Sequence, residues 1–270
     1  LILSYYNAAH SKFNKILEEI MENKYRIIDT HAHLFKEYYS DLDDVILECL
    51  NNGVNKIIIS GCDMASNKEV LELVSKYDCI YGTLGFHPTE LDDFKDEYFD
   101  WLEDNINNRK IVGVGEIGLD YHYEDTNREL QKMVFKRQLD IASRNKKPIV
   151  VHSRDAIGDT YNILKDYKLR GSIHAFSGSV EMAQEFIKLG YMIGVGGVVT
   201  FKNAKNIKEV VKSVPLAYIL LETDSPYLTP EPYRGEVNSS KNIPLIANKI
   251  AELKEVSNID VSRVTSDNAE

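Results

Sequence analysis

The stretch YRIIDTHAH at residues 25–33 joins a short apolar run to two histidines, His31 and His33. Side chains alternate between the two faces of an extended chain, so these imidazoles point the same way and can bind one ion together. A lone histidine at the end of a strand is more often a structural residue, whereas two at this spacing indicate a metal site. The stretch therefore predicts both a buried first strand and one edge of a metal centre.

Similar apolar runs, rich in β-branched residues, recur along the chain and predict further strands. The full set lies at residues 25–29, 55–60, 79–85, 110–115, 148–151, 171–173, 191–195 and 217–221. Runs without polar alternation are typical of strands covered by helices on both faces, and helical stretches separate most of them. Eight βα units in 270 residues fit a TIM-type (β/α)8 barrel of a single domain, with an open doubly wound sheet as the alternative.

The barrel is expected to occupy residues 25–270, because no linker rich in Pro, Ser or Gly and no internal repeat divides them. Residues 1–24 are expected to form an N-terminal helical extension. Its apolar residues are spaced by three and four and predict one amphipathic helix: Phe13, Ile16, Leu17, Ile20 and Met21.

The overall composition sets wide limits on function. The hydrophobic fraction of 43% and the charged fraction of 27% are typical of a globular protein with a sizeable core. No apolar run is long enough to span a membrane and no secretory signal is visible, so we expect a cytoplasmic protein, with a monomer as the default. The three cysteines lack CxxC spacing and are expected to be reduced thiols. The net charge of −10 argues against tight binding along a duplex, although divalent cations would neutralise some carboxylates.

Residues with metal-ligand chemistry follow four further predicted strands. They are Glu116 after the fourth strand, His152 after the fifth, His174 after the sixth and Asp224 after the eighth. Because a parallel barrel gathers the carboxyl ends of its strands at one mouth, we expect these side chains to converge with those of the first strand. Imidazole and carboxylate ligands suit zinc, manganese or iron better than copper.

Glu116 lies in GVGEIG at residues 113–118, a string that matches the dinucleotide-binding fingerprint. That fingerprint requires a helix to begin at its last glycine, and LDYHY follows instead, so this interpretation fails. A carboxylate has two oxygens and can bridge two cations, which makes Glu116 the candidate bridging ligand. Asp224 is expected to ligate the first ion and to take a proton from the attacking water.

Other polar residues near the expected mouth have roles that the sequence leaves open. His87, in GFHP at residues 85–88, is expected to orient or protonate the substrate, with a structural role as the alternative. Asp29 either accepts an imidazole N–H or caps a turn at the end of its strand. Glu222 is either a structural acid or a partner of a ligand, and His122 is expected to lie in a loop without a role.

Six motifs together resemble those of the TatD family. They are DTHAHL at 29–34, GFHP at 85–88, GEIGLDY at 115–121, HSRD at 152–155, HAFSG at 174–178 and ETDSPYL at 222–228. The family is a branch of the amidohydrolase-like metal-dependent hydrolases with a TIM barrel, and its members are described as metal-dependent deoxyribonucleases. The resemblance implies two divalent metal ions, one held by His31, His33, Glu116 and Asp224 and the other by Glu116, His152 and His174.

The substrate contacts follow from the same resemblance and from residue chemistry. Arg234 lies in a segment that resembles the family's Arg-Gly-x-x-Asn loop, although Ser239 and Ser240 stand where a Glu-Pro pair is usual. Arg154 is a candidate donor to a phosphate oxygen, with an ion pair to Asp155 or another loop acid as the alternative. Tyr121 and Tyr227 are candidates for stacking on bases, with packing as the alternative.

The sequence therefore predicts a hydrolase that cleaves phosphodiester bonds in DNA, from an end of a single strand. Two ions roughly 3.5–4 Å apart would activate a water and stabilise the charge that develops on the phosphate. Zinc, manganese and magnesium are all candidates. The first alternative is hydrolysis of an amide or ester, either of a small molecule or of an aminoacyl-tRNA, in the same mouth. A non-catalytic binding module is the least favoured, because no expected ligand is missing.

Overall fold

A computed structural model describes residues 27–270, and the helix expected within residues 1–24 lies outside them. One sheet of eight parallel strands runs in the order β1 to β8, so the alternative of a doubly wound sheet is wrong. The strands are β1 (Ile27–Ala32), β2 (Val54–Ser60), β3 (Ile80–Leu84), β4 (Ile111–Asp120), β5 (Ile149–Arg154), β6 (Gly171–Ile173), β7 (Tyr191–Val195) and β8 (Ile219–Leu221). Each strand pairs with the next along the chain, as in a (β/α)8 barrel.

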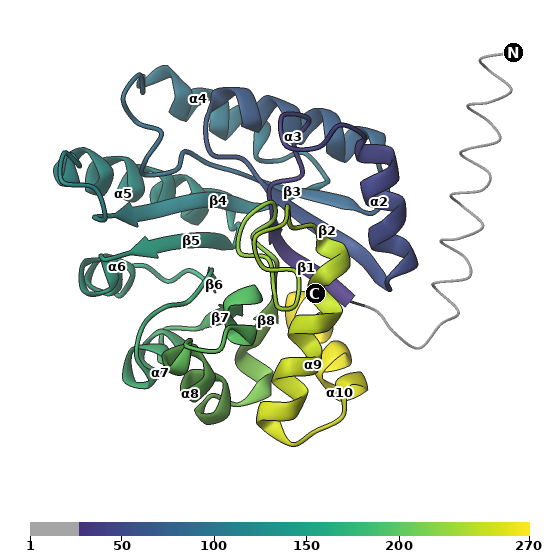
Figure 1. The fold of residues 1–270 in the computed structure, drawn as a ribbon. Coiled ribbons are helices and arrows are strands. Elements are labelled where there is room, and N and C mark those ends of the chain that lie inside the picture. Colours follow the sequence, from purple (N-terminus) through teal and green to yellow (C-terminus); the bar gives the residue numbers. More distant parts are fainter. Residues whose placement is uncertain (1–26) are drawn as a thin grey trace, which may run out of the picture.

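Helices surround the strands in Figure 1. They are α2 (Leu42–Asn51), α3 (Met64–Lys76), α4 (Glu97–Asn105), α5 (Arg128–Asn145), α6 (Ile157–Leu164), α7 (Val180–Lys188), α8 (Lys205–Ser213), α9 (Ile243–Lys254) and α10 (Asn258–Ala269), with short 3-10 turns at Gly197–Thr200, Leu216–Tyr218 and Ser240–Asn242. Several of these helices have a side-chain cap at their N-terminus. The carboxylate of Asp63, for example, accepts the backbone N–H of Ser66 at the start of α3. Across residues 27–270, none of these helices has the length and apolar character needed to cross a membrane.

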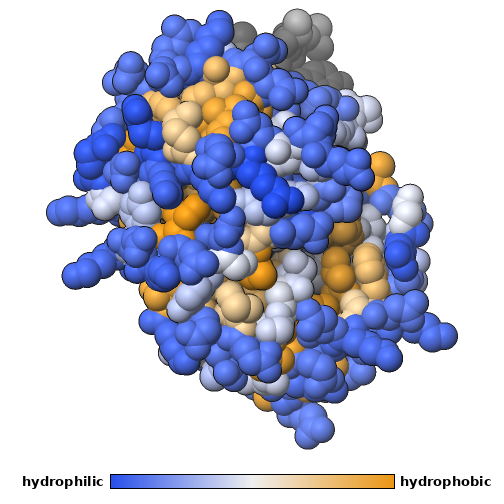
Figure 2. All heavy atoms as spheres, turned by 90° about the vertical axis from the view of Figure 1, so that its left-hand side faces the viewer, coloured by the Kyte–Doolittle hydropathy of each residue, from blue (hydrophilic) through white to orange (hydrophobic). Residues whose placement is uncertain are grey.

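The apolar runs that predicted the strands form the core. Ile57, Ile59, Val114, Ile117 and Ile193 are all fully buried. Burying one such side chain stabilises the fold by about 1.5–3 kcal/mol. The face of the molecule drawn in Figure 2 is mostly hydrophilic, with hydrophobic residues gathered in small separate patches. The core therefore lies between the sheet and its helices, and the surface carries the charge.

The first and last strands meet through a few polar contacts rather than a continuous ladder. One isolated bridge joins Ala32 to Ser225, and the backbone N–H of His33 donates to the carbonyl of Ser225 over 2.6 Å. The carboxylate of Asp29 accepts backbone N–H groups of His31 and Thr223. Asp29 therefore caps the turn at the end of its strand rather than accepting an imidazole N–H, because backbone amides and the hydroxyl of Thr223 occupy its oxygens.

Three strands run further than their apolar stretches predicted. His31 lies within β1, Glu116 within β4 and His152 within β5, and not beyond the strand ends. In β4 glycine allows the strand to continue. Gly118 pairs with His152 and has a φ of 146°, a backbone angle that residues with a side chain rarely adopt. A Cβ atom at Gly118 would overlap the carbonyl oxygen of His152. The strand therefore continues through a stretch whose glycines look like a strand end in the sequence.

A cavity of about 610 Å³ opens at the amino-terminal end of the strands. Residues from the beginnings of strands and from the last helix line it, among them Ile28, Lys56, Arg170 and Glu270. The predicted ligands lie at the opposite, carboxyl end, where the active sites of TIM barrels are found. The cavity at the amino-terminal end is therefore remote from the predicted ligands.

Candidate metal centre

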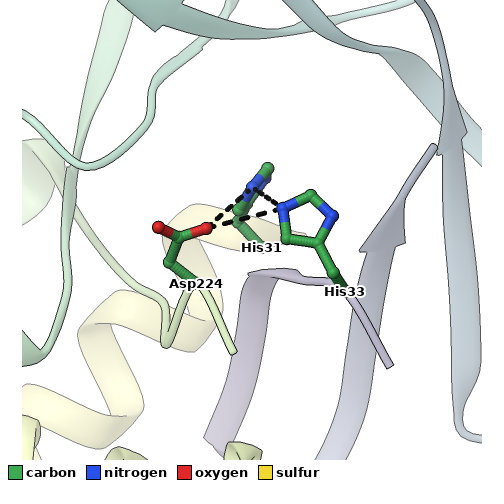
Figure 3. A group of neighbouring side chains, drawn as sticks. All are labelled: His31, His33 and Asp224. Atoms are coloured by element: carbon green, nitrogen blue, oxygen red, sulfur yellow. Dashed lines mark hydrogen bonds and ion pairs between the residues drawn. The ribbon is translucent and has the colours of Figure 1, made fainter. Parts of the chain in front are cut away.

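The structure brings the six predicted ligands together at the carboxyl ends of the strands. The Nε2 atoms of His31 and His33 lie 3.1 Å apart, and Oδ1 of Asp224 lies 3.5 Å from each of them. Figure 3 shows these three side chains pointing toward a common centre. With the Oε2 atom of Glu116 they form what we call the first metal position.

Glu116 lies between this group and a second pair of histidines. Its Oε2 atom is 3.3 Å from Nε2 of His31 and 3.5 Å from Nε2 of His33. Its Oε1 atom is 2.9 Å from Nδ1 of His152 and 2.8 Å from Nε2 of His174. Each carboxylate oxygen therefore faces a different histidine pair. We call the group around Oε1 the second metal position.

The spacing of these atoms fits a shared cation. Ligand atoms that bind one zinc ion at about 2.1 Å with tetrahedral angles lie about 3.4 Å from one another. In the first metal position the separations run from 3.1 to 3.5 Å. In the second they run from 2.8 to 3.3 Å. Mixed nitrogen and oxygen donors at these separations suit zinc, manganese or iron.

The electrostatics of the cluster also favour a cation. Burial disfavours the charged forms of His31 and His33, but the nearby carboxylates of Glu116 and Asp224 outweigh it and raise their pKa values to about 10 and about 9. Burial likewise opposes ionisation of Glu116, yet the surrounding imidazoles hold its pKa well below the usual range. Protonated imidazoles thus balance buried carboxylates, a role that a divalent cation would take over.

Comparison with known proteins now decides the family, because the TatD related DNase model matches residues 28–270. The chain belongs to the TatD family. It is 40% identical over 247 residues to YabD of Bacillus subtilis, described as an uncharacterized metal-dependent hydrolase, and the match covers 90% of this chain and 97% of that protein. This TatD protein is therefore a metal-dependent hydrolase of the amidohydrolase-like superfamily.

Solved structures of TatD relatives share the fold. The crystal structure of YjjV, a TatD homologue from Escherichia coli, matches with a TM-score of 0.87 at 32% identity, over 91% of this chain and 97% of that one. A TatD family hydrolase from Entamoeba histolytica matches with a TM-score of 0.80 at 25% identity, over 90% of this chain and 96% of that one. The cluster of this TatD protein is thus carried by a barrel that its relatives also have.

Two acids within the quoted motifs support the TatD ligands from outside the ligand set. Asp120, at the end of β4, lies with Oδ2 3.1 Å from Nε2 of His152. Glu222 accepts the backbone N–H of Ala175 over 2.5 Å and lies 3.8 Å from Nδ1 of His174. Burial raises the pKa of Glu222 to about 8. Glu222 is therefore the neighbour of a ligand, one of the two roles the sequence left open.

Ser60, the last residue of β2, is a supporting residue that lies outside the motifs. Its Oγ atom lies 3.1 Å from Nδ1 of His31, and its carbonyl oxygen lies 3.0 Å from Nδ1 of His33. A signal for it was present, because Ser60 ends a predicted strand as the ligands do. A serine at a strand end is common in sequences, whereas a histidine or an acid there stands out.

His87 lies among the ligands of the cluster. Its Nε2 atom is 3.3 Å from Oε1 of Glu116, and its Nδ1 atom is 2.8 Å from the hydroxyl of Thr89. His87, Glu116 and His152 offer ligand atoms that all lie within 4.8 Å of one another. The structure therefore places His87 beside the second metal position, and its role toward the substrate stays a prediction.

Among the expected substrate contacts, Tyr227 lies next to a ligand. Its side chain is 51% exposed, its ring centroid is 6.3 Å from that of His33, and its hydroxyl lies 3.1 Å from the hydroxyl of Tyr38. Both the hydroxyl and the ring of Tyr121 already have partners. The hydroxyl donates to Asp159, and the guanidinium of Arg128 lies 4.4 Å from the ring centroid. Tyr227 is the better placed of the two tyrosines.

The two expected arginines differ in their surroundings. The exposed Arg154 lies 5.8 Å from the ring centroid of Tyr123, while Asp155 pairs with His122 at 3.0 Å. Asp155 thus contacts the loop histidine, and the role of Arg154 toward a phosphate oxygen stays a prediction. The guanidinium of Arg234 lies 4.3 Å from the ring centroid of Phe201.

Proposed function

We propose that this TatD protein hydrolyses phosphodiester bonds of DNA from an end of a single strand. The observation that supports this most is Glu116, whose two oxygens face two separate histidine pairs at 2.8 to 3.5 Å. Paired cation positions joined by one carboxylate are typical of enzymes that displace a leaving group from phosphorus, because they neutralise both the attacking and the leaving oxygen. When bound, two divalent ions would supply a nucleophilic water at neutral pH and positive charge for the phosphate.

Asp224 is the proposed proton acceptor. Burial opposes its ionisation, but hydrogen bonds from His31 and His33 hold its pKa below the usual range, so it stays charged at neutral pH. Its side chain remains 14% exposed at the mouth, where a water can reach it. The residue adopts a φ of 54°, a strained value for a non-glycine residue, which persists at sites that the fold over-determines. Its backbone N–H donates to the carbonyl of His31 and fixes this turn.

The neighbouring residues would bind and orient the DNA. The side chain of His87 is only 12% exposed, and desolvation lowers its pKa, so its imidazole is neutral and would orient the phosphate by hydrogen bonding. Tyr227 offers an exposed ring for base stacking, and Arg154 offers a planar donor to a phosphate oxygen. The net charge of −10 argues against tight binding along a duplex, which favours a short single-stranded end.

A nuclease assay tests the proposal. Purified protein is stripped of metal, supplied with magnesium, manganese or zinc alone, and incubated with single-stranded DNA labelled at either end. We expect metal-dependent release of short products from one end, abolished by a chelator and absent from a Glu116→Gln preparation, which controls for contaminating nucleases.

The acidic balance of the chain favours one alternative, hydrolysis of an amide or ester on a smaller substrate. The same preparations are therefore given simple esters, amides and an aminoacyl-tRNA. Turnover of any of these without cleavage of DNA in any metal would replace the proposal with the alternative.

A further inference from the structure

Strand β2 contributes no predicted ligand, yet its last residue contacts both histidines of the first metal position. Ser60 offers its Oγ atom to Nδ1 of His31 at 3.1 Å and its carbonyl oxygen to Nδ1 of His33 at 3.0 Å. The two Nε2 atoms lie 3.1 Å apart. They face Asp224, toward which Figure 3 shows both rings turned. A single residue thus contacts the outer nitrogen of both rings.

The chemistry of imidazole determines which atom donates in each of these hydrogen bonds. A neutral imidazole that binds a cation through Nε2 carries its proton on Nδ1, and a hydrogen-bond acceptor at Nδ1 selects that tautomer. The carbonyl oxygen of Ser60 can only accept, so it fixes the Nδ1–H form of His33. The hydroxyl of Thr83 donates to Oγ of Ser60 over 2.8 Å, which leaves Oγ a lone pair for Nδ1–H of His31.

The residues after Ser60 hold the rest of the centre in register. The carbonyl of Gly61 accepts the backbone N–H of Glu116 over 3.0 Å, and the carbonyl of Cys62 accepts the backbone N–H of His87 over 2.8 Å. Gly61 lies so close to the side chain of Asn67 that an added Cβ atom would overlap it. The end of β2 is therefore tightly packed against α3.

Asn67 in turn is anchored. Its side chain accepts the N–H of Gly85 over 3.0 Å and donates to the carbonyl of the same residue over 2.6 Å. Both Ser60 and Asn67 are fully buried. The oxygens that Ser60 presents are consequently fixed in position before any ion binds.

We propose that Ser60 is the positioning residue of the first metal position, which holds His31 and His33 in the Nδ1–H tautomer with both Nε2 lone pairs turned to one cation. This inference rests on the paired metal positions of the proposed function, but it does not require DNA to be the substrate. Removing the hydroxyl affects only His31, because the carbonyl that contacts His33 belongs to the backbone. The two histidines therefore respond differently to the same substitution.

The experiment measures zinc binding by metal-free protein in competition with a chelating dye, without substrate. Ser60→Ala and Ser60→Val are expected to weaken the first metal position by about 10–100-fold and to leave the second within about threefold of wild type. Ser60→Thr has nearly the shape of the valine variant but keeps the hydroxyl, and should bind zinc as wild type does. Ser153→Ala is the matched control, because this serine lies in β5 and its hydroxyl contacts that of Thr160 at 2.9 Å.

Imidazole resonances of the zinc-loaded protein, observed by NMR, assign the effect. The Nδ1 proton of His31 is expected to exchange rapidly with water in Ser60→Ala, while that of His33 stays protected as in wild type. If Ser60→Ala does not fold, the isosteric threonine and valine pair decides. Equal zinc affinity for folded valine and threonine variants, with both Nδ1 protons protected, would overturn the assignment. Absence of DNA cleavage would not, because none of these measurements involves DNA.

Discussion

Asp29 on β1 accepts two hydrogen bonds from Thr223, which lies 194 residues later in the chain beyond the end of β8. The backbone N–H of Thr223 donates to Oδ1 over 3.0 Å and its hydroxyl donates to Oδ2 over 2.5 Å. Both residues are fully buried. Because a few backbone contacts rather than a continuous ladder join the neighbouring segments, this pair contributes to the closure of the barrel beside His31.

Asp29→Ala is expected to lower the free energy of unfolding by about 2–4 kcal/mol, because it leaves buried donors of Thr223 and His31 without an acceptor. Asp29→Asn should cost less, since the amide oxygen keeps one acceptor. Burial raises the pKa of Asp29 to about 6, so the asparagine also avoids a buried charge at neutral pH. Denaturant unfolding of the metal-free variants measures the free energy of unfolding of each. Equal stabilities of the alanine variant and wild type would show that other contacts close the barrel.

Glu116→Gln is expected to reduce metal content from two ions to at most one per chain, because the amide cannot replace a charged oxygen at both positions. Hydrolase activity should fall by at least about 10²–10³-fold, the loss typical of one electrostatic group in an active site. Mass spectrometry of the intact loaded protein counts the ions. Glu90→Gln, at an exposed acid on the loop that carries His87, is the control. Two ions held normally by the Glu116 variant would disprove the bridging role.

Asp120→Asn is expected to weaken the second metal position by about 10–100-fold, because Asp120 orients His152 through Nε2 and strengthens it as a ligand. The first metal position should be unaffected. Zinc titration resolves the two affinities, and the pattern is the mirror image of that expected for Ser60. A variant that loses affinity at both positions equally would instead point to a general loosening of the mouth.

Metal binding is expected to release protons, because His31 and His33 have pKa values of about 10 and about 9 in the metal-free protein. Raised values mean that the protonated rings stabilise the folded metal-free state. That contribution is complete below pH 6.5 and is lost as the pH rises through about 9 to 10. The metal-free protein should therefore lose thermal stability from pH 7 to 10, while its zinc affinity rises over the same range. Calorimetry in buffers of different ionisation enthalpy counts the protons, and a pH-independent zinc affinity would contradict this account.

Tyr227→Ala is expected to weaken binding of single-stranded DNA by about 1–3 kcal/mol, the usual contribution of one base stacked on an aromatic ring. Tyr227→Phe keeps the ring and loses only the contact between its hydroxyl and that of Tyr38, so it should bind nearly as wild type does. Because the ring lies beside His33 and not among the ligands, KM should change more than kcat. If phenylalanine and alanine behave alike, stacking at this position is excluded.

Much of the architecture could be predicted from the sequence, because buried parallel strands are nearly continuous apolar runs. All eight predicted runs correspond to strands of the sheet. The ends of β1, β4 and β5 were set too early, since the sequence there changes from apolar to polar or glycine residues while the pairing continues. In a barrel mouth, polar side chains are tolerated inside strands because they point to the site.

The grouping of histidines and acids was also predictable, whereas the residues that support them were not. Histidine is an uncommon residue, so histidines that recur at the ends of several strands are easily noticed. Ser60 and Asp120 are ordinary residues in a sequence, and their value comes from neighbours brought in by other strands. The surroundings of Tyr121 were equally hidden, because Arg128 and Asp159 reach it only through the packing of two helices.

The ligands of the first metal position come from β1, β4 and the segment after β8, so this position is complete only when the last strand has joined the first. A ribosome that has released β1 to β7 presents two histidines and one glutamate without the aspartate that follows β8. High-affinity capture of the ion should therefore be among the last events of chain assembly, and the bound metal would lock the two ends of the sheet together once they meet.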